Sequence, residues 1–190
     1  PDIIAVTGDI ISDAEDIPVA KALIDELVKI SDVYFISGNH DFSSEGSEAL
    51  EGVLADAGVR YLKNEYLPLE RGGDRIILAG VEDPNRWADS ISPDRFAEEL
   101  RADYPDDCVV LLAHRNYWVT EYPELPVELI LCGHEHGGII RIPGVGGLIG
   151  HGKTLLPEYC EGEFKSGDYT MIVSRGIGNS FPLPRLNNPP

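Results

Sequence analysis

The chain is poor in basic residues, since 15 Lys and Arg stand against 33 Asp and Glu among 190 residues and give a formal net charge of −18. Proteins that bind nucleic acid usually offset phosphate charge with a stripe of Lys and Arg, and the sequence holds no such stripe. The charge balance therefore excludes nucleic acid as an expected partner and indicates a solvated acidic surface.

Cysteine is also scarce. The three cysteines, Cys108, Cys132 and Cys160, are odd in number and widely spaced, which argues against a disulfide framework and indicates a reducing compartment. Cys108 and Cys132 lie within apolar runs, so we expect both to be small buried core residues.

Long hydrophobic runs are missing as well. Apolar stretches such as 108–113 fall far short of the roughly 18 residues of a membrane-spanning helix and suit buried strands. The length and an apolar content of 43% favour one globular domain over residues 1–190. The chain begins with Pro1 rather than methionine, so we expect an upstream segment in the parent protein. Cytoplasmic and membrane-associated locations therefore both stay open.

The hydrophobic pattern predicts alternating strands and helices. Apolar runs predict strands at 3–7, 33–37, 59–62, 75–80, 108–113 and 127–132. Helical periodicity predicts helices at 16–28, capped by Asp16, at 47–57 and from Ser92 onward. Because strand 3–7 is apolar throughout, we expect it to be central. Short runs at 139–142, 147–149 and 169–174 are typical of an antiparallel sheet, and segment 83–91 is a candidate active-site flap.

Four of the predicted strands end in groups that bind metal or transfer protons. Strand 3–7 leads into Asp9, and strand 33–37 leads into the Gly-Asn-His-Asp sequence of 38–41. Strand 108–113 leads into His114, and strand 127–132 into the Gly-His-Glu-His sequence of 133–136. The carboxyl ends of strands in an α/β sheet share one edge, and imidazole and carboxylate groups bind divalent ions. The sequence therefore predicts a metal site at that edge.

These motifs, in this order and spacing, resemble those of the calcineurin-like metallophosphoesterases. The resemblance covers residues 3 to about 140, and the stretch 173–180 with Pro184-Arg185 resembles the branch of bacterial membrane-associated phosphohydrolases. It implies an α/β fold in which two mixed β-sheets pack as a sandwich flanked by helices. Relative to the family, the usual first strand and helix are absent, so we expect a single domain that is N-terminally incomplete.

The resemblance also implies a hydrolase of phosphomonoesters or phosphodiesters with two divalent ions. Asp9 would bridge the ions, Asn39, His114 and His134 would complete the second ion's shell, and His136 would bind the first. His40 would aid the leaving group. Mn²⁺ is the expected metal, with Fe or Zn²⁺ as alternatives.

Two departures from the family pattern bear on these expectations. The Asp-x-His motif that supplies two ligands to the first ion is absent, so the first ion keeps only Asp9 and His136. We expect this chain to hold the second ion better. The family also often places an Asp three residues after the bridging Asp to orient the histidine, and here that position is Ser12, followed by Asp13.

Several alternatives stay open. A scaffold of the same fold that has lost turnover is the rival to the hydrolase. The substrate is a phosphoester small molecule, with lipid-linked and nucleotide-linked diphosphates as candidates, and membrane association through an upstream segment and the oligomeric state are undecided. For the remaining polar and aromatic residues, we expect Asp41 to accept backbone hydrogen bonds beneath the site and Glu135 to face solvent or pack away from the metals. Arg115 and Arg175 could each meet phosphate or form a salt bridge, His151 is a loop residue or a substrate contact, and Trp87, Tyr117 and Trp118 pack loops or line a pocket.

Overall fold

The computed structural model describes residues 1–83, 91–138, 140–142, 146–150 and 154–178. Most of the predicted flap, Trp87, His151 and the stretch from Asn179 to Arg185 lie outside these residues. The helices are η1 (Ala14–Asp16), α1 (Ile17–Leu27), α2 (Asn39–Ser43), α3 (Ser47–Asp56), α4 (Pro93–Asp103) and α5 (Trp118–Glu121). The strands are β1 (Ile3–Val6), β2 (Asp32–Phe35), β3 (Arg60–Tyr61), β4 (Glu65–Arg71), β5 (Asp74–Gly80), β6 (Cys108–Leu112), β7 (Leu129–Cys132), β8 (Ile140–Ile142), β9 (Gly146–Ile149), β10 (Gly162–Ser166) and β11 (Tyr169–Val173).

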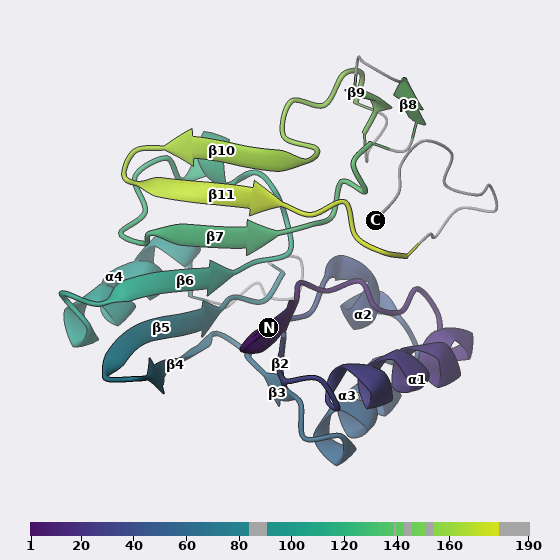
Figure 1. The fold of residues 1–190 in the computed structure, drawn as a ribbon. Coiled ribbons are helices and arrows are strands. Elements are labelled where there is room, and N and C mark those ends of the chain that lie inside the picture. Colours follow the sequence, from purple (N-terminus) through teal and green to yellow (C-terminus); the bar gives the residue numbers. More distant parts are fainter. Residues whose placement is uncertain (84–90, 139, 143–145, 151–153, 179–190) are drawn as a thin grey trace.

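Two sheets form the body of the molecule (Figure 1). The smaller has the order β1-β2-β3 with parallel neighbours. A helix between two strands, as predicted for 3–7, 16–28 and 33–37, usually joins parallel neighbours. The larger has the order β10-β11-β7-β6-β5-β4, in which β11, β7, β6 and β5 run parallel and both outer strands run antiparallel to their neighbours. A separate two-stranded sheet, β8-β9, follows the loop after β7.

Alternation along the strands explains how the two sheets pack. Tyr34 of β2 shares one apolar cluster with Leu78 of β5 and Leu112 of β6, so these side chains fill the space between the sheets. The neighbouring residues Phe35 and Ile77 point to the opposite faces of their sheets. Because successive strand residues face opposite sides, one apolar run can serve both an inner and an outer core.

Helices cover the two outer faces. Apolar side chains of α1 and α3 pack against the small sheet, and they include Ala20, Ile24 and Leu54. On the other side, Phe96 and Leu100 of α4 pack against the large sheet. The molecule is therefore a sandwich of two sheets between helices (Figure 1), and the predicted α/β class is confirmed.

Some local predictions were wrong. Strand 3–7 was expected to be central, but β1 is half-buried and pairs only with β2 among the described strands. The prediction failed because an apolar run alone does not distinguish a central strand from an edge strand. Residues 169–173 form β11, which pairs with β10 but also joins β7 of the main sheet in parallel. Asp16 precedes α1, but its carboxylate accepts the N–H groups of Ser12 and Asp13 instead of capping that helix.

The cysteines are free, and Cys132 and Cys160 are buried. Cys108 is exposed, contrary to expectation, since it opens β6 at the sheet's rim. Within the described residues, no helix is long and apolar enough to cross a membrane.

Candidate metal centre

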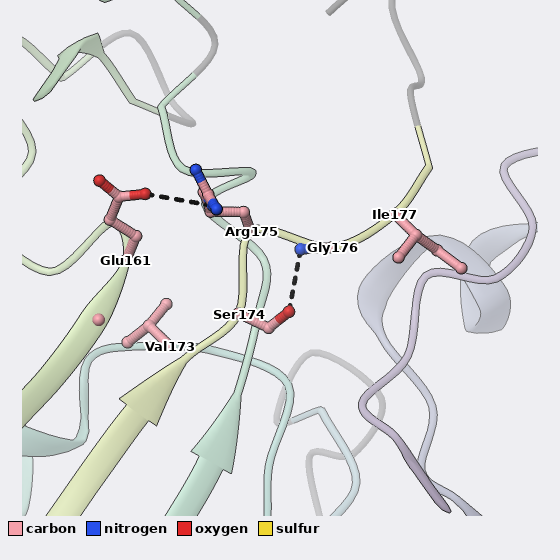
Figure 2. A pocket seen from close by; sticks show the side chains of 7 residues that line it. Glu161, Val173, Ser174, Arg175, Gly176 and Ile177 are labelled. Atoms are coloured by element: carbon pink, nitrogen blue, oxygen red, sulfur yellow. Dashed lines mark hydrogen bonds and ion pairs between the residues drawn. The ribbon is translucent and has the colours of Figure 1, made fainter. Parts of the chain in front are cut away.

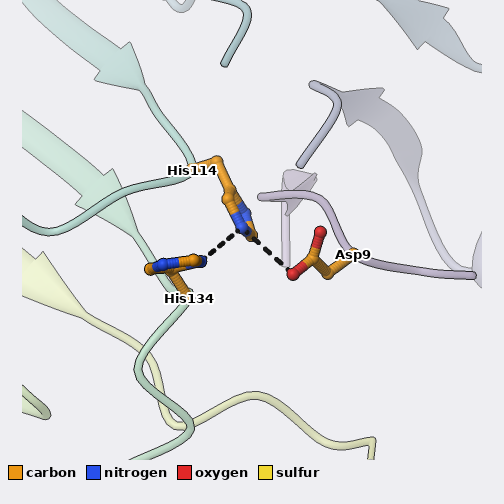
Figure 3. A group of neighbouring side chains, drawn as sticks. All are labelled: Asp9, His114 and His134. Carbon is orange, nitrogen blue, oxygen red and sulfur yellow. Dashed lines mark hydrogen bonds and ion pairs between the residues drawn. The ribbon is translucent and has the colours of Figure 1, made fainter. Parts of the chain in front are cut away.

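Three predicted ligands meet where the two sheets come together (Figure 3). Asp9 follows β1, His114 follows β6 and His134 follows β7, so each comes from the carboxyl end of a different strand. The backbone turns sharply at two of them, with φ of 57° at Asp9 and 72° at His134. Left-handed backbone in residues other than glycine is costly and gathers at functional sites. The strain therefore marks the same place as the ligand set.

The ligand atoms are close enough to share one ion. His114 Nε2 lies 3.1 Å from Asp9 Oδ2 and 3.0 Å from His134 Nδ1, and the three ligand atoms all lie within 4.8 Å of one another. Metal–ligand bonds of about 2.1 Å at right angles place two ligand atoms about 3.0 Å apart. The spacing therefore suits three adjacent ligands of one divalent ion.

A hydrogen bond fixes which nitrogen of His114 faces this point. His114 Nδ1 lies 2.8 Å from the carbonyl oxygen of Thr7, and since a carbonyl only accepts, Nδ1 carries the proton. In a neutral imidazole, Nε2 then presents its lone pair to the Asp9 carboxylate. Two acceptors that face each other at 3.1 Å require a positive charge between them, either a proton or a metal ion. Thr7 thus orients His114 in the way that metal-binding histidines are held.

The pKa values of Asp9 and His114 also indicate that a positive charge is favoured between these two side chains. Burial opposes the charge on Asp9, but the hydrogen bond and charge of His114 and the His40 N–H outweigh it and lower the pKa of Asp9 to about 2. Burial also opposes the charge on His114, but the neighbouring Asp9 carboxylate outweighs it and raises the pKa of His114 above its ordinary value. Asp9 is therefore a permanent anion, and the position beside it attracts a cation.

Asp41 holds the two loops together beneath the site. Its carboxylate accepts the N–H groups of Asp9 at 2.6 Å, Ile10 at 2.8 Å, Ile11 at 3.1 Å and Gly38 at 2.8 Å. Its side chain is buried, with 2% of the residue exposed, and burial raises the pKa of Asp41, although these donors favour the charged form. The structural role predicted for Asp41 is confirmed.

Gly38 keeps open the space into which the ligands project. A Cβ at this position would lie 2.2 Å from Asp9 Oδ1 and 2.6 Å from His114 Cε1. Gly8, with φ of 91°, has a matching role, because its Cβ would lie 2.3 Å from the nitrogen of Gly38. The two glycines let the loops after β1 and β2 approach each other at the ligand set.

Asn39 opens α2, directly after Gly38. Its Oδ1 atom is buried and has no hydrogen-bond partner among the described residues. A buried amide oxygen without a donor is costly, and a divalent ion would satisfy it. This observation fits the predicted role of Asn39 as a neutral ligand beside Asp9, His114 and His134.

The other two predicted site residues, His40 and His136, are not members of the group formed by Asp9, His114 and His134. His40 is half-buried and its backbone N–H donates to Asp9 Oδ1 at 2.9 Å, so it is anchored beside the ligand set. Among the described residues, no hydrogen bond joins Ser12 or Asp13 to the His40 imidazole, and the Asp13 carboxylate instead caps η1. His136, with φ of 54°, is not in the group formed by Asp9, His114 and His134.

Several neighbouring residues have structural partners. Arg115 forms a two-pronged ion pair with Asp83, at 2.6 Å and 3.2 Å, and the Asp83 side chain is 1% exposed. The salt bridge is therefore correct for Arg115, although it is not an exposed one. Trp118 is buried and donates to the Arg115 carbonyl at 2.6 Å, which confirms loop packing. Glu135 is buried, so it does not face solvent.

Sequence reasoning missed residues that act through a backbone carbonyl group or through the absence of a Cβ atom. Nothing in the sequence identifies the carbonyl of Thr7 as a partner of His114, because every residue has a carbonyl group. The roles of Gly8 and Gly38 had a signal, since each glycine directly precedes a ligand motif at the end of a strand.

Comparison with known proteins agrees with this geometry. The pattern of the calcineurin-like phosphoesterases matches residues 1–138. The uncharacterized metallophosphoesterase YkuE of Bacillus subtilis is 30% identical over 201 residues, which cover 100% of this chain and 65% of that protein. The phosphodiesterase YaeI of Escherichia coli is 27% identical over 195 residues, which cover 98% of this chain and 67% of that protein.

Two solved structures share the fold. Sulfate thiohydrolase SoxB of Thermus thermophilus has a TM-score of 0.58 at 14% identity, over 90% of this chain and 33% of its own. NAD nucleotidase of Haemophilus influenzae has a TM-score of 0.59 at 17% identity, over 90% of this chain and 39% of its own. The chain spans about two thirds of the curated relatives YkuE and YaeI. The family pattern covers most of the chain, and the chain therefore belongs to the calcineurin-like phosphoesterase family.

Proposed function

We propose that the protein is a metal-dependent hydrolase of phosphoesters. The observation that carries this proposal is the meeting of the Asp9, His114 and His134 ligand atoms. The buried Asn39 oxygen, which has no hydrogen-bond partner within the described part of the chain, supports it. A divalent ion held there would lower the pKa of a coordinated water towards about 7 and offset phosphate charge. Mn²⁺ is the proposed metal, because imidazole, carboxylate and amide oxygen together suit ions of that kind.

The surrounding residues keep the site in one arrangement. Thr7 holds the proton on His114 Nδ1, so that Nε2 stays available to the ion. Asp41 fixes the backbone of Asp9 and Gly38 through its hydrogen bonds. His40, anchored through its backbone to Asp9, is the proposed proton donor to the leaving oxygen. His136 is proposed as a ligand of a further ion.

Replacing His40 separates an enzyme from an inactive scaffold of the same fold. We expect His40→Ala to bind Mn²⁺ as the wild type does but to hydrolyse bis(p-nitrophenyl) phosphate about 10²- to 10⁴-fold more slowly, the range that general acids contribute. The measurements are steady-state kinetics and a Mn²⁺ titration on the same preparations. A wild-type protein that binds Mn²⁺ without turning over this ester or p-nitrophenyl phosphate would favour the scaffold.

Metal content tests how many ions this chain holds. The described residues bring three ligands together around one point, without His136, so we expect about one tightly bound ion per chain. Elemental analysis after dialysis against trace Mn²⁺ gives the number directly. Two tightly held ions would contradict this expectation and would place His136 in a second complete shell.

Mn²⁺ affinity should depend on pH through His114. A proton and the ion compete for Nε2, and the pKa of His114 lies above 6.5, so affinity should already fall as the pH drops to 6.5 and continue to fall about tenfold per unit below. Asp9, with a pKa of about 2, stays ionised over this range. Mn²⁺ titrations between about pH 5 and pH 8 would show this, with circular dichroism as a check on folding. An affinity that does not change would exclude Nε2 as a ligand.

The substrate class is a small phosphoester, with lipid-linked and nucleotide-linked diphosphates as proposed candidates. Membrane association of the parent protein is a proposal that a relative in Danio rerio supports. That protein, 24% identical over 193 residues, is named a transmembrane protein with metallophosphoesterase domain.

A further inference from the structure

Two arginines follow strands of the large sheet at the edge where the metal ligands lie. Arg175 follows β11 and lines an open pocket of about 620 Å³, where its Nε lies 3.4 Å from a carboxylate oxygen of Glu161 (Figure 2). Arg115 follows β6 and comes directly after His114. Its Nε and one terminal nitrogen lie 2.6 Å and 3.2 Å from the two carboxylate oxygens of Asp83. Arg115 is therefore held by a shorter, two-pronged contact, right beside a proposed ligand.

The pair of Asp83 and Arg115 is largely hidden from solvent. The side chain of Asp83 is 1% exposed and that of Arg115 is 22% exposed. Taking two charges out of water costs free energy that their attraction often only offsets, so stability alone is a poor explanation for a buried pair. A two-pronged contact does fix both the distance and the orientation of the guanidinium group, because its donors lie in one rigid plane. The pair is therefore suited to hold a segment in one place.

This pair joins the ends of β5 and β6 beyond the sheet itself. The two strands lie side by side and in parallel up to Gly80 and Leu112. The Val81 N–H then donates to the Leu112 carbonyl at 3.0 Å. Asp83 and Arg115 lie beyond this hydrogen bond, so their side chains continue the connection between the two strands towards the edge where the ligands lie.

The position of Arg115 restricts that of His114. The peptide unit between two residues is planar, so a fixed Arg115 limits how the backbone of His114 can move. The Trp118 side chain donates to the Arg115 carbonyl at 2.6 Å and holds the same residue from its other side. The Gly133 N–H donates to the His114 carbonyl at 2.9 Å. His114 therefore lies between a connection to β5, through Asp83, and a connection to the loop after β7.

We propose that Asp83 and Arg115 are positioning residues of the metal centre, which hold His114 where it can share one ion with Asp9 and His134. The inference rests on the proposed metal site and adds two residues that lie outside its ligand set. The two charges of the pair cancel, so the pair supplies geometry to the site and no net charge. Groups that orient a metal ligand typically contribute about 10- to 100-fold to metal affinity.

Replacing both members by amides tests this without a change in net charge. The double variant Asp83→Asn with Arg115→Gln loses the charged contact but leaves no single charge buried, which would be strongly destabilising. We expect its Mn²⁺ affinity to fall about 10- to 100-fold. Arg115→Lys should lie between the wild type and the double variant, because a charged hydrogen bond remains without the paired donors. Calorimetric Mn²⁺ titrations give the affinities, and circular dichroism of the metal-free proteins checks that they are folded.

The same two strands carry a matched control pair at their other end. Arg75 lies near the start of β5 and Asp107 directly precedes β6, and the guanidinium group contacts the carboxylate through two nitrogens at 2.7 Å each. Because the strands are parallel, this pair lies at the edge of the sheet opposite to the ligands. The double variant Arg75→Gln with Asp107→Asn makes the same chemical changes there, and its Mn²⁺ affinity should equal that of the wild type.

Unchanged Mn²⁺ affinity in the Asp83 and Arg115 double variant would overturn the inference. An equal loss in the control variant would do so too, since it would indicate a general loosening of the sheet, as would Arg115→Lys binding no more tightly than the double variant. If the double variant does not fold, Arg115→Lys decides alone, and wild-type affinity there overturns the positioning role. A wild-type protein that binds no Mn²⁺ overturns the metal centre as well. Affinities in the expected order, without hydrolysis of p-nitrophenyl esters by the wild type, would count against the hydrolase and leave the positioning role standing.

Discussion

Gly38→Ala is expected to reduce Mn²⁺ affinity by at least about 100-fold while the protein stays folded. The added methyl group would lie 2.2 Å from Asp9 Oδ1, 2.6 Å from His114 Cε1 and 2.7 Å from the Asp9 nitrogen. Contacts this short force atoms to move, and both side chains are proposed ligands. Disturbing groups that only support a ligand costs about 10- to 100-fold in affinity, so displacing two ligands should cost more. A Mn²⁺ titration measures the effect.

Gly52→Ala is the matched control for this substitution. Gly52 lies within α3, and a Cβ there would meet nothing within 4 Å. Alanine should leave Mn²⁺ affinity unchanged and stabilise the helix by about 0.5–1 kcal/mol. If Gly38→Ala bound Mn²⁺ as tightly as Gly52→Ala does, the ion would not lie between Asp9 and His114.

Asp41→Ala should lower the free energy of unfolding by about 3–5 kcal/mol, because the carboxylate satisfies four backbone N–H groups in a buried place. A buried donor left without an acceptor costs about 1–3 kcal/mol, and water entering the cavity would recover part of the sum. Asp41→Asn keeps the shape and one oxygen, so its loss should be smaller. Urea unfolding, monitored by circular dichroism, gives the three values.

Asp56→Ala controls for the loss of an acidic residue. Asp56 ends α3 and is exposed, so its removal should change the free energy of unfolding by no more than about 0.5 kcal/mol. A loss for Asp41→Ala as small as that for Asp56→Ala would show that Asp41 does not hold the loops after β1 and β2 together.

The ligand set was predictable because parallel strands end at one edge of a sheet. Asp9, His114 and His134 are far apart in sequence, yet each lies within two or three residues of the end of an apolar run, and that pattern predicted that they meet. Asp41 was predictable for a similar reason, since an acid one residue beyond His40 lies beneath the site. Strand-end position alone does not separate His134 from His136, because the turn between them decides which imidazole points towards Asp9. The family resemblance made that distinction, since it implied that His134 joins Asp9 and His114 and that His136 binds the other ion.

The outer strands of the large sheet were not predicted. Strand β4 contains Pro68 and polar residues, which are typical of loops but are tolerated at a sheet edge. The adjacent Gly72 and Gly73, both with positive φ, form the turn between β4 and β5. A pair of glycines signals a hairpin, although the composition of β4 does not indicate a strand. Strand β10 is similarly polar. Edge strands bury only part of their surface, so hydrophobic patterning marks them weakly.

Anomalous diffraction at the manganese absorption edge, from crystals grown with Mn²⁺, tests the central claim most directly. The account predicts a peak in contact with Asp9, His114 and His134, with the Asn39 amide oxygen as a further ligand. Absence of such a peak from these crystals, or a peak that touches none of these side chains, would contradict it.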